Sequence, residues 1–138
     1  CSVDADMARA CYEAALEVDP DIIIMVLAAT AMEDVVRDLG CNWAGEIFAD
    51  RAYNDDATLV DRSQPGAVIH DPAVAGPRIL QMVQEGAIIT VSGKRIPTAI
   101  DTICLHGDTP TAVALAGSVR DSLNAGGIAI AKFSGRRG

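Results

Sequence analysis

The sequence predicts an α/β fold in which mostly parallel strands form a sheet that outer helices cover. Apolar residues recur at helical spacing over residues 5–18, and a continuous aliphatic run follows at 22–27. Continuous aliphatic runs are typical of strands buried on both faces, as in parallel sheets. The same alternation of helix and strand continues along the chain, which indicates a parallel sheet. The pattern is compatible with an open sheet or with part of a closed barrel, which usually has about eight parallel strands.

The expected elements follow one another along the chain. The first helix stops at Asp19–Pro20. Thr30 begins the second helix as its N-cap, with Glu33 at the capping-box position and Gly40 directly after the helix end. The further strands are predicted at 41–49, 87–91, 100–105 and 127–131, and the further helices at about 71–84 and 110–124.

Residues 50–78 interrupt this alternation. The stretch is polar and rich in Asp, Pro and other turn-forming residues, and Asp71–Pro72 begin the next helix within it. A connection of this length is unusual in a compact domain and is often functional or lid-like. His70 directly precedes the helix, and we interpret it as part of the helix start rather than of a site.

Composition limits the classes of partner. The chain has 138 residues, of which 50% are hydrophobic, and a net charge of −8. It suits one domain, offers no basic stripe for nucleic acid, and has no apolar run of the about 20 residues that a membrane helix needs. The spacing of the four cysteines is unlike that of a zinc site. We expect Cys11, Cys41 and Cys104 to be buried and reduced, which favours the cytoplasm.

The first candidate site is the junction formed by His106, Gly107 and Asp108, which follow a predicted strand. Ligands of α/β folds bind at the carboxyl ends of parallel strands. His106 can act there as acid, base or metal ligand, and Gly107 allows a sharp turn and the close approach of a ligand. Two alternatives stay open. Asp108 can simply cap a helix with Pro110 at its first position, and His106 can be a buried, hydrogen-bonded structural residue.

The second candidate site contains Glu46, Asp50, Arg51 and Tyr53. Glu46 lies in an otherwise apolar strand and shares a face with Asp50 by alternation. A buried carboxylate is costly unless it is paired, and the expected partner is Arg51, Arg62 or a group outside this sequence. Arginine also presents a planar fork that matches a substrate carboxylate. The alternative is a structural ion pair without a role in binding.

Three long segments resemble the LamB/YcsF family. They are DPDIIIMVLA at 19–28, EIFADRAYNDDATLVDRSQPGAVIHDP at 46–72, and VSGKRIPTAIDTICLHGDTPTAVALA at 91–116. The resemblance implies an irregular, TIM-like (β/α) barrel of the glycoside hydrolase/deacetylase type. It further implies that residues 1–138 are one domain, the C-terminal portion of that barrel, with the N-terminal portion outside this sequence. Ala57 stands where the family has glycine, so a left-handed backbone is expected at an alanine.

The resemblance also implies a reaction. The family's characterised role is in bacterial ATP-dependent 5-oxoprolinase, which opens the lactam ring of 5-oxo-L-proline to L-glutamate. ATP would be handled by partner subunits B and C or by the N-terminal portion outside this sequence, since the chain has no G-x-x-x-x-G-K-[ST] loop. A metal would have at most the three candidate catalytic residues as ligands. The implied catalytic residues are His106, Asp108 and Glu46, and the implied substrate-binding residues are Arg51, Arg62, Asp50, Tyr53 and Gly107.

Two other functions remain alternatives. The chain can be a non-catalytic subunit that binds its partners or a small carboxylate. Fold analogy also allows a metal-dependent, deacetylase-like hydrolase. Titration with 5-oxoproline separates the first alternative from an enzyme, and metal analysis of the full-length protein tests the second.

Overall fold

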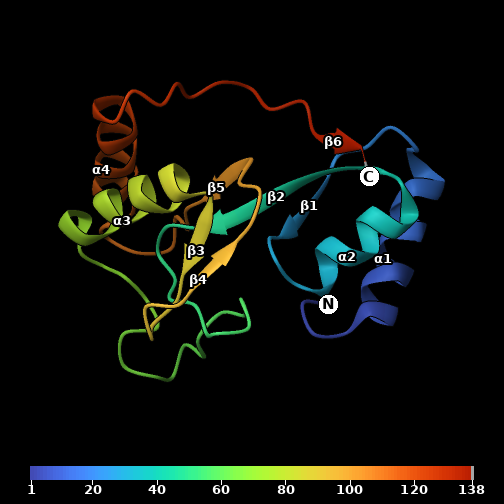
Figure 1. The fold of residues 1–138 in the computed structure, drawn as a ribbon, viewed down its shortest axis with the longest axis horizontal. Helices are drawn as coiled ribbons and strands as arrows, with labels where there is room; N and C mark the ends of the chain where they lie inside the picture. The colour runs from blue at the N-terminus through green and yellow to red at the C-terminus, as the bar shows by residue number, and fades with distance from the viewer. Residues whose placement is uncertain (138) are drawn as a thin grey trace.

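The computed structural model describes residues 1–137, and Figure 1 shows its helices and strands. None of the described helices combines the length and the apolar character needed to cross a membrane. The helices are α1 (Ala5–Val18), α2 (Ala31–Leu39), α3 (Pro72–Glu85) and α4 (Ala112–Ala125), and the strands are β1 (Ile24–Leu27), β2 (Asn42–Phe48), β3 (Ala87–Ile89), β4 (Arg95–Pro97), β5 (Thr102–Cys104) and β6 (Arg136–Arg137).

Strand β2 is the centre of the main sheet. β1 pairs with it in parallel, from Ile24 opposite Trp43 to Leu27 opposite Glu46. β5 also pairs with it in parallel, and Phe48 stands opposite Cys104. β6 is antiparallel to the start of β2, so the described sheet is mixed. The α/β class with parallel neighbouring strands is therefore confirmed, while closure into a barrel stays a proposal.

The predicted last strand at 127–131 is wrong. Ile128 donates its N–H to Leu123 and packs on the core, and the chain then crosses the molecule without strand pairing, as Figure 1 shows. Alternating apolar residues satisfy a burial pattern, but a strand also needs backbone partners. The pairing comes later, at β6, where an ion pair of 2.7 Å joins Arg136 to Asp101.

A short hairpin, β3–β4, forms a separate two-stranded sheet. β3 lies within the predicted strand, whereas β4 was not predicted. Gly93 has a φ of +85° at the turn, and Lys94 donates to the carbonyl of Asp55 at 2.8 Å. The hairpin is thereby tied to the long connection that follows β2.

Two apolar clusters hold the layers together. At one end of the molecule α1 and α2 pack around Trp43 of β2, whose ring also lies 4.6 Å from the Arg37 guanidinium. At the other end α3 and α4 pack against each other over Ile47, with the sheet between the two helix pairs (Figure 1). Residues of β2 thus serve both clusters, and the strand connects them.

Helix α2 begins at Thr30, as predicted, and Gly40 ends it with a φ of +63°. The capping box is not formed as predicted. The Glu33 carboxylate accepts the N–H of Ala29 at 2.8 Å rather than that of Thr30, and it also pairs with Arg37 at 2.7 Å. Ala29 has a φ of +59°, which turns its N–H toward that carboxylate.

The connection between β2 and α3 is folded back on itself. Isolated bridges join Arg51 to Val68 and Tyr53 to Leu59, and Ala67 is fully buried. Ala57 has a φ of +66°, which confirms the left-handed backbone expected there. The segment is therefore a packed loop that positions the residues directly after β2.

The cysteines are unpaired. Cys41 is buried, as expected, whereas Cys104 is only half-buried and Cys11 is exposed, so the predicted burial of Cys11 is wrong. Its place on the amphipathic helix α1 is outside the face that carries the buried residues Ala8 and Tyr12.

A substitution at Gly45 tests how closely the segment before β5 approaches β2. A Cβ there would lie 2.5 Å from the carbonyl oxygen of Ala99, whereas a Cβ at Gly117 in α4 would meet nothing within 4 Å. We expect Gly45→Ala to lower the free energy of unfolding by about 1–3 kcal/mol. Gly117→Ala should instead raise it by about 0.5–1 kcal/mol, because alanine is favoured within a helix. Urea unfolding followed by circular dichroism measures both; equal effects would contradict this packing.

Candidate functional site

The imidazole of His106 meets the carboxylate of Asp50 where β2 and β5 end. Phe48 and Cys104 are opposite each other in the sheet, and Asp50 and His106 each come two residues later. The Nδ1 atom of His106 lies 2.7 Å from Oδ2 and 3.0 Å from Oδ1 of Asp50. The two clusters singled out in the sequence therefore meet at the strand ends, with one residue from each in contact.

Asp50 is held firmly in this contact. Its residue is 4% exposed, its carbonyl accepts the N–H of Ile69 at 2.8 Å, and its Oδ2 also accepts the backbone N–H of His106 at 3.3 Å. The Phe48 ring lies against the imidazole with 5.3 Å between ring centroids. The imidazole is thus fixed by a carboxylate and by an aromatic ring.

The other ring nitrogen, Nε2, has no hydrogen-bond partner among residues 1–137, and the His106 side chain is 30% exposed. His106 lines a hollow of about 220 Å³ at the start of α4. Gly107 lies on the wall of the same hollow, next to His106 as the sequence analysis expected. The remaining lining residues are apolar: Leu105, Ala112, Val113 and Ala116.

Glu46 lies on the face of β2 that lines a larger cavity of about 690 Å³ between the sheet, α4 and the crossing segment 128–133. Burial raises the pKa of its carboxyl, and the nearby His106 opposes that rise. No ion pair joins Glu46 to Arg51 or Arg62 within residues 1–137, so neither of these two expected partners pairs with it, and a partner from the N-terminal portion stays a prediction. Glu46 is a carboxyl group in a largely apolar cavity, which favours proton transfer.

Thr102 was not singled out in the sequence. It stands opposite Glu46 in the sheet and lines the same cavity, where its hydroxyl is buried and has no partner in the described chain. A threonine in a strand gives no sequence signal of this kind, because threonine is common in strands.

Arg51 and Tyr53 support the loop instead of facing an open hollow. Arg51 is 7% exposed, and its guanidinium donates to the carbonyls of Val60 at 2.6 Å and Ala67 at 3.4 Å. Tyr53 is 0% exposed, and its Oη accepts the N–H of Phe48 at 2.7 Å. Burial raises the pKa of Tyr53 to about 12. The geometry therefore does not support the expected contacts of these two side chains with substrate.

Arg78 of α3 also stabilises this loop, a role that the sequence did not predict. It donates to the carbonyl of Arg51 at 3.0 Å, and its guanidinium lies 5.7 Å from the centre of the Tyr53 ring. Burial lowers its pKa, an effect that the nearby Tyr53 opposes. Spacing along a helix does not reveal that an arginine binds a distant loop carbonyl.

Arg62 and Asp108 are both exposed and form an ion pair at the surface, with 3.8 Å between their charged groups. We call this pair the rim of the site, because Asp108 follows Gly107 in the chain. Asp108 does not cap α4: the N-cap is Thr111, which makes no side-chain cap hydrogen bond. The helix begins at Ala112, so the prediction of Pro110 at its first position is also wrong. The fixed φ of proline is used in the turn before the helix.

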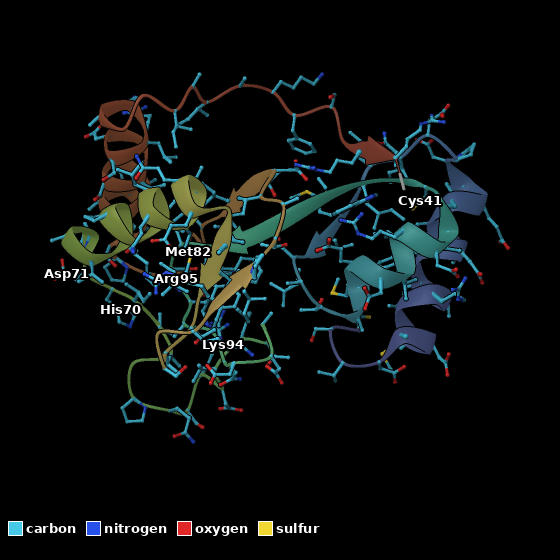
Figure 2. All side chains as sticks on the ribbon, in the orientation of Figure 1. Cys41, His70, Asp71, Met82, Lys94 and Arg95 are labelled. Carbon is cyan, nitrogen blue, oxygen red and sulfur yellow. The ribbon has the colours of Figure 1, made fainter. Side chains whose placement is uncertain are left out.

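His70 directly follows Ile69, whose N–H binds the Asp50 carbonyl, but the His70 side chain takes no part in the Asp50–His106 contact. His70 is exposed beside Asp71 at the start of α3, and Figure 2 shows it at the opposite end of the molecule from Cys41. Asp71 caps the helix by accepting the N–H of Ala73 at 2.8 Å. Within residues 1–137, no three His, Cys, Asp or Glu side chains gather as a metal site.

Fold and site define an α/β protein with a hydrogen-bonded aspartate–histidine pair at the carboxyl ends of parallel strands. The model of the LamB/YcsF family matches residues 1–138. The chain therefore belongs to the LamB/YcsF family.

Named relatives agree with this assignment. The chain is similar to the A subunit of 5-oxoprolinase from Ruegeria pomeroyi, with 70% identity over 96% of this chain and 53% of the relative. It is 50% identical to the protein of the same name from Rhodopseudomonas palustris, covering 94% of this chain and 51% of the relative. A crystal structure of a lactam utilization protein from Thermus thermophilus matches with a TM-score of 0.83 and 35% identity, covering 96% of this chain and 52% of that one. The chain spans about half the length of these proteins.

Glu46 gives the fold a pH dependence of defined sign. Burial raises the pKa of Glu46, so the folded chain holds this proton more tightly than the unfolded chain does. The free energy of unfolding therefore falls as the pH rises from the ordinary pKa of a glutamate to the raised pKa of the folded state. Glu46→Gln removes this penalty. We expect the variant to gain stability relative to the native chain at about pH 7.5 but much less at about pH 4. Urea unfolding at both pH values measures the gain; an equal difference at both would contradict the burial of the charge.

Proposed function

We propose that this chain is part of the A subunit of a 5-oxoprolinase and that its His106 site acts on the lactam of 5-oxo-L-proline. The observation that carries the proposal is the Asp50–His106 contact at the sheet edge, in a chain 70% identical to a protein of that name. The runner-up functions, a deacetylase-like hydrolase and a scaffold subunit, have no comparable observation in their favour.

Opening a lactam needs a nucleophilic water, a proton for the leaving nitrogen and an anchor for the substrate carboxylate. In this proposal His106 accepts the proton of the attacking water and returns a proton to the nitrogen as the C–N bond breaks. Glu46, with its raised pKa, is the second proton donor or acceptor. Arg62 binds the carboxylate at the rim, where Asp108 orients it, and Gly107 leaves room for the ring.

The assembly is also part of the proposal. The chain spans about half of its relatives, so we propose that an N-terminal portion completes a (β/α) barrel around the cavity that Glu46 lines. The relatives carry the name of one lettered component of 5-oxoprolinase, which supports a complex. We propose subunits B and C as the partners, with ATP consumed in the assembled enzyme. Unpaired cysteines favour a cytoplasmic location.

A full-length chimera tests the function. Residues 1–138 replace the matching half of the Ruegeria pomeroyi protein, the chimera is combined with subunits B and C, and L-glutamate formed from 5-oxoproline and ATP is measured. We expect activity in the chimera and a loss of about 10²–10⁴-fold with His106→Ala, the usual contribution of an acid–base residue.

His70→Ala is the matched control, because this histidine is exposed and its side chain makes no hydrogen bond to Asp50 or His106, although the preceding Ile69 donates its backbone N–H to Asp50. It should leave turnover unchanged. Full activity of the His106→Ala chimera in an intact complex would contradict the catalytic role and favour the scaffold function.

A further inference from the structure

The Asp50–His106 contact determines which nitrogen of the imidazole is available. An ionised carboxylate only accepts hydrogen bonds. Both oxygens of Asp50 face Nδ1, at 2.7 and 3.0 Å, so Nδ1 carries the proton that is donated. In a neutral imidazole the other nitrogen, Nε2, is then the acceptor, and it has no partner among residues 1–137.

The surroundings keep this arrangement rigid. Asp50 is nearly inaccessible, and its position is set on both sides, by the Ile69 N–H on its carbonyl and by the two donors of His106 on its carboxylate. The loop that carries Asp50 is itself fixed by Tyr53, whose Oη takes the N–H of Phe48, and by Arg78, which binds the carbonyl of the residue after Asp50. Rotation of the ring would lose the Asp50 contact and the packing on Phe48.

We propose that Asp50 is the positioning residue of the site: it fixes His106 with the proton on Nδ1, so that Nε2 is the atom that takes the proton of the attacking water. This differs from the substrate-binding role expected for Asp50, because its carboxylate is occupied by His106 and is buried. The catalytic role of Nε2 rests on the proposed function, whereas the position of the proton on Nδ1 follows from the Asp50–His106 contact alone.

Asp50→Ala removes the acceptor of the ring proton. Oδ2 of Asp50 lies 2.7 Å from Nδ1 and also accepts the backbone N–H of His106, so an amide oxygen in that position would keep both contacts and an asparagine would leave the proton on Nδ1. Without the carboxylate nothing holds the proton on Nδ1, and it moves mainly to Nε2, which can then no longer take a proton from water. The amide signals of the rest of the chain show whether the variant is folded, separately from the tautomer.

Nitrogen-15 NMR of the 138-residue chain reads the tautomer directly, since the sequence has only two histidines and the exposed His70 is an internal reference. At a pH where both rings are neutral, we expect His106 to show the proton on Nδ1 in the native chain and mainly on Nε2 in Asp50→Ala. Asp108→Ala is the matched control and should leave the His106 tautomer unchanged. A native proton on Nε2, or no change in a folded Asp50→Ala variant, would overturn the inference.

Turnover of the full-length chimera gives the second readout. Asp50→Ala should lower kcat by about 10²–10⁴-fold with little change in KM, because the ring proton then lies mainly on the acting nitrogen while the binding groups remain. A switched tautomer with unchanged kcat would overturn the use of Nε2. An inactive parent chimera would instead count against the proposed function, and the NMR result would still decide the proton position.

Discussion

The carboxylate of Asp50 and the imidazole of His106 meet because β2 and β5 are parallel neighbours in one register. Several surrounding contacts hold β2, β5 and the loop after β2 in the positions that this hydrogen bond needs. Gly45 lets the segment before β5 cross close to β2, and Asp101 accepts the Gly45 N–H at 2.9 Å. Beyond the strands, the folded loop fixes the backbone on both sides of Asp50. Tyr53 accepts the N–H of Phe48, Arg78 donates to the carbonyl of Arg51, and Arg51 donates to the carbonyl of Val60. A one-residue slip of β5 would move His106 to the other face of the sheet.

The site places two carboxyl groups in opposite environments. Asp50 is buried and its carboxylate accepts both donors of His106, whereas Glu46 has no partner within residues 1–137 and lies in a mainly apolar cavity, where burial raises its pKa. Two titratable groups in unlike surroundings are the usual basis for separate roles in acid–base chemistry. In the proposed mechanism Asp50 orients His106, His106 and Glu46 exchange protons, and the exposed pair Arg62 and Asp108 binds the charged substrate.

Local patterns predicted the elements well wherever periodicity and capping chemistry agreed, as at Thr30 and Asp71. They failed where tertiary contacts decided the outcome. The apolar alternation at 127–131 found no neighbouring strand, and β4 is a strand because the turn at Gly93 brings it onto β3. Strand ends predicted the location of His106, but the guanidinium of Arg51 binds carbonyls of a folded loop, which no spacing in the sequence encodes.

In the mechanism proposed above, Asp50 directs Nε2 of His106 at the substrate. A crystal structure of the full-length chimera with 5-oxoproline bound would show this directly. We expect the lactam beside Nε2 of His106 in the hollow bordered by Gly107, with Nδ1 still on Asp50. A lactam bound at another face of the protein, or a His106 ring turned away from Asp50, would contradict that arrangement.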